Sequence, residues 1–243
     1  MKLLKSMGLS LLTMSLIGCG AMQRSQEVAE FEKFPAPQSG SPTLVVPVGS
    51  VEAENVSAKG GMAFGLIGAL VELAATANSS AERGKKATAA MVEAKIEEYL
   101  AKQVATKLTE SCGLKTDVYK EVLAKNDKEW VKKREPVDGS VLNNPKRRVA
   151  YVVEAGTTRL SIIDGLAVTK LCITGTAKVF EAPAGSLVNK VTVTNGGMSC
   201  NHSLSHYSDD DPEKFNELKS VTKTALDELA TDIAVGVCKK KVD

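Results

Sequence analysis

The stretch Leu166–Asn195, with the sequence LAVTKLCITGTAKVFEAPAGSLVNKVTVTN, decides the fold of this chain. From Leu166 to Glu181 apolar or small residues alternate with polar ones, which is the period of a strand with one buried face. Pro183-Ala184-Gly185 predicts a turn, and Ser186–Asn195 then alternates again. The stretch therefore predicts two long antiparallel strands. The alternating set is Ile173, Gly175, Ala177 and Val179 against Thr174, Thr176 and Lys178.

A further strand precedes this hairpin. Val149–Glu154 and Thr157–Ile163 are rich in β-branched residues and are separated by Gly156. Asp164-Gly165 then has the composition of a hairpin turn. Together with the hairpin, these segments predict a three-stranded antiparallel meander.

Two other segments have strand character. Thr43–Val51 is apolar and β-branched, and we expect it to be interrupted or to lie at an edge at Pro47, because proline has no N–H for a ladder. Leu114–Tyr119 predicts a short strand.

The longest helical pattern runs from Lys85 to Glu110. Ser79–Glu82 predicts its start through a serine cap, and Cys112-Gly113 predicts its end, because glycine suits the left-handed C-terminal position. A single apolar face is expected from residues that recur every four positions: Val92, Ile96, Leu100, Val104 and Leu108.

Two further helices are expected. Asn126–Glu129 resembles a capping box and opens a short helix that carries Trp130 and ends before Pro136. Asp211-Pro212 starts a second long helix that continues to Cys238. Its apolar face is predicted to be Phe215, Leu218, Val221, Ala225, Leu229 and Ile233.

The order of these elements predicts an α+β fold. Two long amphipathic helices, each with one apolar stripe, are expected to cover one face of a mostly antiparallel sheet, as a two-layer sandwich.

The N-terminal segment Met1–Gly20 predicts the location of the protein. Lys2 and Lys5 precede an apolar run of about 12 residues, which is shorter than the roughly 20 needed to span a bilayer. It closes with Leu16-Ile17-Gly18-Cys19, which resembles the lipobox of bacterial lipoproteins. The alternative is an ordinary secretory signal with a chance cysteine.

The resemblance to a lipobox implies cleavage before Cys19 and a diacylglycerol on its sulfur. Gly20 after this cysteine looks like the outer-membrane sorting outcome of such proteins. We therefore expect a signal peptide over 1–18, a lipidated cysteine and flexible tether over 19–42, and one periplasmic domain over 43–243. The tether is predicted from a polar composition rich in Pro, Ser and Gly.

The charge excludes an obvious nucleic-acid partner. The chain has 31 basic and 29 acidic residues, and removal of Lys2 and Lys5 leaves 29 of each. The mature protein is therefore close to neutral, and membrane attachment is expected to come from the lipid.

Apart from Cys19, the chain has four cysteines, namely Cys112, Cys172, Cys200 and Cys238. In an exported protein an even number of cysteines predicts disulfides, with buried free thiols as the alternative. Three pairings are open. The predicted strand positions favour Cys172 with Cys200 across the hairpin, which leaves Cys112 and Cys238 for each other.

No motif of an active site is present: the chain lacks a phosphate-binding loop, a dinucleotide fingerprint, His-Glu-x-x-His and a nucleophile elbow. Cys200, His202 and His206 are weak candidate ligands for zinc or copper. The aspartates that follow have a sufficient function at the start of the last helix. We therefore expect no enzyme and no cofactor beyond the lipid on Cys19.

Three segments suggest surfaces. Gly60–Ala77 is glycine-rich and nearly uncharged, so it is either a membrane-contacting or self-associating segment or a buried helix or apolar loop. Lys132–Arg134 and Lys146–Arg148 are basic triplets that could meet phosphate-bearing lipid or a cell-wall polymer, or could be solvated loop.

The hairpin Lys178–Asn189 and the closing helix Ala225–Ala234 look like the end of several lipoprotein domains. These are the auxiliary lipoproteins of ABC-type transporters, the penicillin-binding-protein activator lipoproteins and the curli-secretion channel lipoproteins. The resemblance implies a non-enzymatic periplasmic domain that docks on an envelope protein. The glycine-rich segment departs from the two non-pore families and keeps open an outer-membrane homo-oligomer. A metal-binding or hydrolytic enzyme that uses His202 and His206 is the third alternative.

Overall fold

The computed structural model describes residues 36–49, 53–57, 82–124, 127–134, 149–164, 169–182, 185–194, 202–205 and 212–239. All of them belong to one compact unit, Ala36–Asp243. The predicted signal peptide, Cys19 and most of the predicted tether lie outside the described residues.

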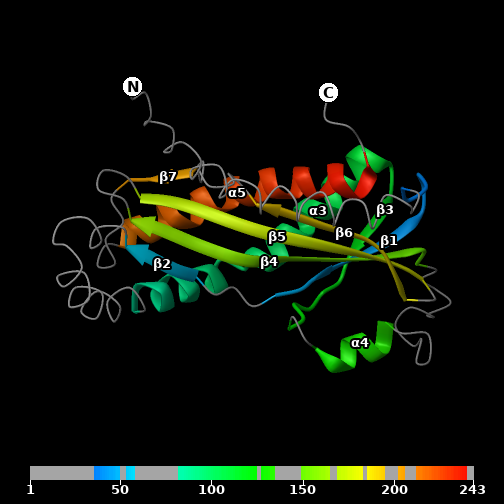
Figure 1. The fold of residues 1–243 in the computed structure, drawn as a ribbon, viewed down its shortest axis with the longest axis horizontal. Helices are drawn as coiled ribbons and strands as arrows, with labels where there is room; N and C mark the ends of the chain where they lie inside the picture. Colours follow the sequence, from blue (N-terminus) through cyan, green and yellow to red (C-terminus); the bar gives the residue numbers. More distant parts are fainter. Residues whose placement is uncertain are drawn as a thin grey trace, which may run out of the picture. The chain divides into compact units, whose positions relative to one another are not determined.

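The sheet is open, mixed in direction and mostly antiparallel (Figure 1). Its main path has the order β3-β1-β4-β5-β6, while β2 pairs with β4 and β7 pairs with β5. The strands are β1 (Pro42–Pro47), β2 (Ala53–Ser57), β3 (Lys115–Val118), β4 (Tyr151–Asp164), β5 (Thr169–Glu181), β6 (Ser186–Thr194) and β7 (His202–Leu204).

The predicted meander is confirmed as the antiparallel strands β4, β5 and β6. The segments on either side of Gly156 form the single strand β4, which has a register shift between Thr157 and Arg159. Gly156 is required at this point, because a side chain there would overlap the carbonyl oxygen of Val48.

β1 ends at Pro47, as expected, but it is not an edge strand. It runs parallel to β3 on one side and to β4 on the other. Pro47 has no N–H to donate, and it is tolerated because the pairing of β1 with β3 has already ended at Val45 and Val118. On the β4 side the N–H of Val48 continues the pairing, since it donates to Ala155 O at 2.9 Å. The chain then returns to β4 as β2, also in parallel.

The predicted continuous helix over 85–110 is wrong at its middle. The described chain is helical over 82–93, turns at Ala94 and Lys95, and resumes as α3 (Ile96–Cys112). Lys95 has φ 51°, which interrupts the regular turn. Because the turn rotates the first segment, Val92 is 59% exposed and Met91 is buried in its place. The other predicted face residues of α3 are buried.

The other helices begin close to the expected positions. In α4 (Lys128–Arg134) the cap is Asp127, one residue after the predicted Asn126, and its Oδ1 accepts from the N–H of Trp130 at 2.9 Å. α5 spans Pro212–Cys238, as predicted from Asp211-Pro212.

α3 and α5 lie side by side and run in the same direction. Tyr99 donates a hydrogen bond to Asp227 at 2.9 Å, a disulfide joins Cys112 to Cys238, and Lys219 Nζ lies 2.9 Å from Glu93 Oε2 just before α3. The sequence separations of these pairs are 128, 126 and 126, so the offset between the helices is nearly constant.

The main core lies between these helices and one side of the sheet. It contains Leu100 and Leu108 of α3 and Leu226 and Leu229 of α5. The inward side chains of β4 and β5, such as those of Val153, Ile173 and Val179, belong to the same core. At Gly175 a Cβ atom would lie 2.5 Å from Leu229 Cδ2, so this glycine permits the close approach of α5 to β5.

A second, smaller core lies on the opposite side of the sheet. It contains Trp130 of α4 and the alternate strand residues Leu44, Val46, Val152 and Phe180. Figure 1 shows α4 below the sheet and α5 above it.

Candidate functional site

The candidate site is the outer face of the sheet, defined as the side of β4, β5 and β6 that points away from α3 and α5. Burial alternates along β5: Leu171, Ile173 and Ala177 are buried in the main core, whereas Lys170 and Lys178 are exposed. The alternate residues of β5 therefore face away from the main core, where Lys170 and Lys178 are exposed, Cys172, Thr174 and Thr176 are half-buried, and Phe180 is buried in the second core.

α4 covers only one end of this face. Trp130 is 4% exposed, and its Nε1–H donates to Glu154 Oε1 at 2.6 Å. Its ring lies 5.7 Å from that of Tyr119, measured between centroids. A buried carboxylate is unfavourable without a hydrogen-bond donor, so this bond allows Glu154 to be buried between the sheet and α4. The same bond connects α4 to the sheet.

Next to this position the face becomes basic. Glu154, Lys178 and Lys190 occupy one row across β4, β5 and β6, in which Lys178 is directly opposite Lys190. Lys178 is exposed and Lys190 is half-buried. Lys178 therefore lies between a carboxylate on β4 and a second ammonium group on β6, so this row carries both signs of charge.

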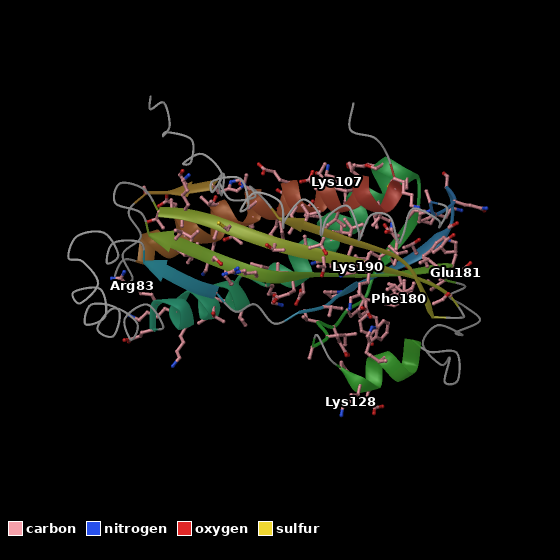
Figure 2. All side chains as sticks on the ribbon, viewed as in Figure 1. Arg83, Lys107, Lys128, Phe180, Glu181 and Lys190 are labelled. Atoms are coloured by element: carbon pink, nitrogen blue, oxygen red, sulfur yellow. A yellow bond between two sulfur atoms is a disulfide. The ribbon has the colours of Figure 1, made fainter. Side chains whose placement is uncertain are left out.

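Other basic residues lie on the same side of the sheet. Arg159 of β4 and Lys170 of β5 are exposed, and they alternate with residues of the main core. α4 has the sequence KEWVKKR, with Glu129 as its only acidic residue. In Figure 2, Lys128 lies on α4 below the sheet, and Lys190 lies along the sheet. We call Lys170, Lys178, Lys190 and Arg159 the basic face.

The helices on the other side of the sheet carry both signs of charge. Acidic residues outnumber basic ones in the sequences of both α3 and α5. The helical segment 82–93 and Lys95 have the reverse balance, with more basic than acidic residues, so the helices on this side are together close to neutral. For α5 the acidic residues are Glu213, Glu217, Asp227, Glu228 and Asp232, against Lys214, Lys219 and Lys223.

The cysteine positions agree with disulfide formation. Cys112 and Cys238 are bonded, with their Cα atoms 5.6 Å apart, which is the pairing that the sequence left to them. Cys172 is also disulfide-bonded. Cys200 lies outside the described residues, so its pairing with Cys172 stays a prediction.

His202 contributes to the packing of β7 against α5. Its Nε2 lies 3.1 Å from Glu228 Oε2, and the neighbouring Ser205 donates from its N–H and its hydroxyl to Glu217 at 2.8 and 2.6 Å. Among the described residues, no group of three His, Cys, Asp or Glu side chains lies close enough to hold a metal ion. His206 is outside the described residues, so the three-ligand hypothesis is not tested.

Two of the three segments singled out as surfaces lie outside the described residues. This applies to Gly60–Ala77 and to Lys146–Arg148, while Lys132–Arg134 form the end of α4. No helix in the described ranges is long and apolar enough to cross a membrane.

The alternating basic residues of the sheet were not recognised as a surface from the sequence. The signal was present as Lys170 and Lys178 at an even spacing within the predicted strand, with Lys190 on the next one. Only the strand register brings these lysines and Arg159 to one side.

Neither a protein-family model nor a curated protein sequence matches the chain. Solved structures do match at low similarity. The chain resembles protein XCC0632 from Xanthomonas campestris, with 13% identity, coverage of 83% of this chain and 85% of the other, and a TM-score of 0.40. It also resembles the PelC dodecamer from Paraburkholderia phytofirmans, with 10% identity, coverage of 82% of this chain and 91% of the other, and a TM-score of 0.37.

A lipoprotein is also among these structures. Lipoprotein GNA1162 from Neisseria meningitidis is 14% identical, with coverage of 63% of this chain and 81% of the other and a TM-score of 0.25. These similarities are too low to transfer a function, partner or assembly to this chain.

Proposed function

We propose that the protein is an outer-membrane lipoprotein whose domain acts as a non-enzymatic accessory or binding module of the cell envelope. The observation that carries the proposal is Leu16-Ile17-Gly18-Cys19 at the end of a short apolar run that begins after Lys2 and Lys5. This arrangement supports cleavage before Cys19 and attachment of a lipid to its sulfur.

The disulfides support export. Cys112 and Cys238 are bonded, and Cys172 is bonded as well. Such bonds persist in oxidising compartments such as the periplasm, and they are rare where thiols are kept reduced.

The architecture supports a binding role. The described residues near His202 serve packing, because the contact with Glu228 joins β7 to α5. The exposed side chains of the outer face, such as those of Lys170 and Lys178, instead offer contacts to a partner. The sequence resemblance to accessory lipoproteins points in the same direction.

The first test is the fate of Cys19 and Gly20 variants in cells. We expect the wild-type protein in the outer-membrane fraction and Cys19→Ala in the soluble periplasmic or uncleaved fraction. Gly20→Asp is a matched control that keeps the lipid but is expected to move the protein to the inner membrane. Wild-type protein that is released without membrane association would overturn the proposed anchoring.

The second test identifies the partner by crosslinking in living cells followed by mass spectrometry. We expect crosslinks from the domain to an envelope protein. Crosslinks between copies alone would instead favour the homo-oligomer, which sizing of a soluble form lacking the lipid would then show as larger than a monomer.

A further inference from the structure

The disulfide between Cys112 and Cys238 joins two cysteines that are not consecutive in the chain. Cys172 and Cys200 lie between them in the sequence, and Cys172 is itself disulfide-bonded. We propose that the native bond forms by rearrangement of an earlier bond between Cys112 and Cys172, and that the chain is a substrate of a periplasmic thiol–disulfide isomerase. The inference rests on the proposed function, because it requires export to an oxidising compartment.

The order of export determines which thiols meet first. Behind an N-terminal signal, Cys112 and Cys172 both enter the compartment before Cys238, which lies near the C-terminus. The lipid occupies the sulfur of Cys19, so Cys112 is the first thiol of the exported chain. At the rate of ribosomal synthesis the segment from Cys172 to Cys238 takes about 3 to 13 s. Disulfide formation begins on the scale of seconds, so Cys112 is expected to bond to Cys172 before Cys238 arrives.

α5 provides the native partner of Cys112, and it is the last element of the chain. Cys238 ends this helix of 27 residues, and Leu229 of the same helix packs against Gly175 of β5. Until α5 is exported, the sides of α3 and β5 that it covers in the main core are open. The incomplete core therefore cannot direct Cys112 to its native bond, and its uncovered apolar residues offer an isomerase a surface to bind.

A bond between Cys112 and Cys172 is incompatible with the folded domain. The row of paired residues that starts at Thr116 of β3 crosses β1 and β4 and ends at Glu181 of β5. Cys172 lies toward the other end of β5, about 30 Å from Glu181 at the strand rise. The chain from Cys112 to Thr116 spans at most about 14 Å, so the two cysteines cannot come within the roughly 7 Å between Cα atoms that a bond requires.

The two cysteines also lie on opposite sides of the sheet. Cys112 packs against the main core, whereas Cys172 alternates along β5 with Leu171 and Ile173 of that core and therefore faces away from it. The early bond must consequently be broken before the domain can close.

Packing of α5 on α3 selects the native pair. Tyr99 donates to Asp227 at 2.9 Å, and Lys219 lies 2.9 Å from Glu93, at nearly the same sequence offset as the disulfide. Once these contacts form, the Cα atoms of the two native cysteines are 5.6 Å apart, within the range for a disulfide. Helix packing thus favours the exchange toward the native bond.

The rearrangement needs no net oxidant. A thiolate of the isomerase attacks the sulfur of Cys112, the bond to Cys172 breaks, and the thiolate of Cys172 leaves. The thiolate of Cys238 then attacks the same sulfur of Cys112, which forms the native bond and returns the isomerase thiolate. The oxidation of Cys112 with Cys172, and the later oxidation of Cys172 with its final partner, each pass two electrons and two protons to a protein disulfide of the compartment, which becomes a dithiol.

The test compares cells with and without their periplasmic disulfide isomerase, both of which retain the disulfide oxidant. The full-length wild-type chain is alkylated in the cells, and non-reducing peptide mapping quantifies the peptides that join Cys112 to Cys238 or to Cys172. The matched control is Cys172→Ala/Cys200→Ala, which leaves Cys112 and Cys238 without an intervening thiol. In a second measurement, an isomerase whose resolving cysteine is replaced with alanine traps mixed disulfides with the wild-type chain.

We expect loss of the isomerase to lower the yield of the Cys112–Cys238 peptide about threefold, because random choice among the three pairings of four cysteines leaves one third. The Cys112–Cys172 peptide is expected to increase, and the control is expected to form its bond equally in both kinds of cell. The trap is expected to hold the wild-type chain through Cys112 or Cys172.

An equal yield of the native bond with and without the isomerase would overturn the proposal. An equal loss in the control would also overturn it, because the requirement would then not come from the intervening cysteines. The trap decides the question even if the control does not fold, since a trap without the wild-type chain would overturn the proposal as well.

The outcome is separable from that of the proposed function. The mass of the N-terminal peptide reports the lipid on Cys19, whereas the peptide map reports the pairing. Lipidated Cys19 with pairing that is independent of the isomerase would leave the proposed function and remove the substrate role. Unmodified Cys19 with pairing that depends on the isomerase would remove the anchor and leave the substrate role.

Discussion

Cys112 at the end of α3 and Cys238 at the end of α5 are joined by a disulfide, which closes the same end of two parallel helices. Because Lys219–Glu93 and Tyr99–Asp227 maintain nearly the same offset further along, the bond secures a helix pair that already matches in register. The two helices supply one wall of the main core.

We predict that Cys112→Ser/Cys238→Ser lowers the free energy of unfolding by about 3 to 5 kcal/mol, since the bond closes a loop of more than about 100 residues in the unfolded chain. Urea denaturation monitored by circular dichroism measures this loss. A difference below about 1 kcal/mol would show that the bond does not restrict the unfolded state as this account requires.

The break between the helical segment 82–93 and α3 predicts an inverted order of substitutions at Lys95. In a regular helix Ala is more stable than Gly by about 1 kcal/mol. Lys95 has φ 51°, where a Cβ atom is unfavourable, so Lys95→Gly is expected to equal or exceed Lys95→Ala in stability. Thermal denaturation of both variants compares their stabilities. A Lys95→Ala variant that is more stable than Lys95→Gly would indicate a continuous helix.

Thr222 of α5 is fully buried, and its hydroxyl has no hydrogen-bond partner among the described residues. Thr222→Val replaces the hydroxyl with a methyl group of similar size. We expect the free energy of unfolding to rise by about 1 kcal/mol, because a buried polar group without a partner is removed. Thr224→Val, at an exposed position on the same helix, is the control. A loss of stability in Thr222→Val would contradict this assignment.

Trp130 is the only tryptophan of the chain, so its fluorescence reports how α4 sits on the sheet. Glu154→Ala removes the acceptor of its indole N–H and is predicted to shift the emission to the red and lower stability by about 1 to 3 kcal/mol. Glu154→Gln keeps an acceptor and serves as the matched control. Emission that is unchanged in Glu154→Ala would mean that apolar contacts alone hold α4.

Tyr99 predicts a dependence of stability on alkaline pH. Burial, followed by the hydrogen bond to Asp227, raises the pKa of this phenol above its usual 10.0. The neutral phenol is therefore favoured in the folded state, and its contribution is present below pH 10 and is lost as the pH rises through the higher folded pKa. We expect Tyr99→Phe to lack this part of the alkaline loss when unfolding is measured between pH 9 and about 11. If the free energy of unfolding falls equally with pH in the wild type and in Tyr99→Phe, this role of Tyr99 is contradicted.

The meander and α5 could be predicted because their signals are local. Alternation in Leu166–Asn195 defines the faces of β5 and β6, and Asp211-Pro212 defines where α5 starts. The parallel insertion of β1 between β3 and β4 could not be predicted, because it depends on partners far along the chain.

The basic face could not be predicted from the sequence either, because it also depends on how the strands pair. The charge sum of the mature chain excludes a strongly basic protein, but a sum does not show which charged residues share one face of the sheet. Lys178 and Lys190 become a pair only when the register of β5 and β6 is known. The break at Lys95 was missed for a related reason, since the four-residue spacing of apolar residues continues across it.

The most direct test of the account is the mass of the N-terminal peptide of the mature protein purified from membranes. The account predicts a peptide that begins at Cys19 and carries diacylglycerol on its sulfur, so that its mass exceeds the sequence mass by that of the lipid. A mature N-terminus at another residue, or an unmodified Cys19, would contradict the central claim that this domain is held at the membrane by one lipidated cysteine.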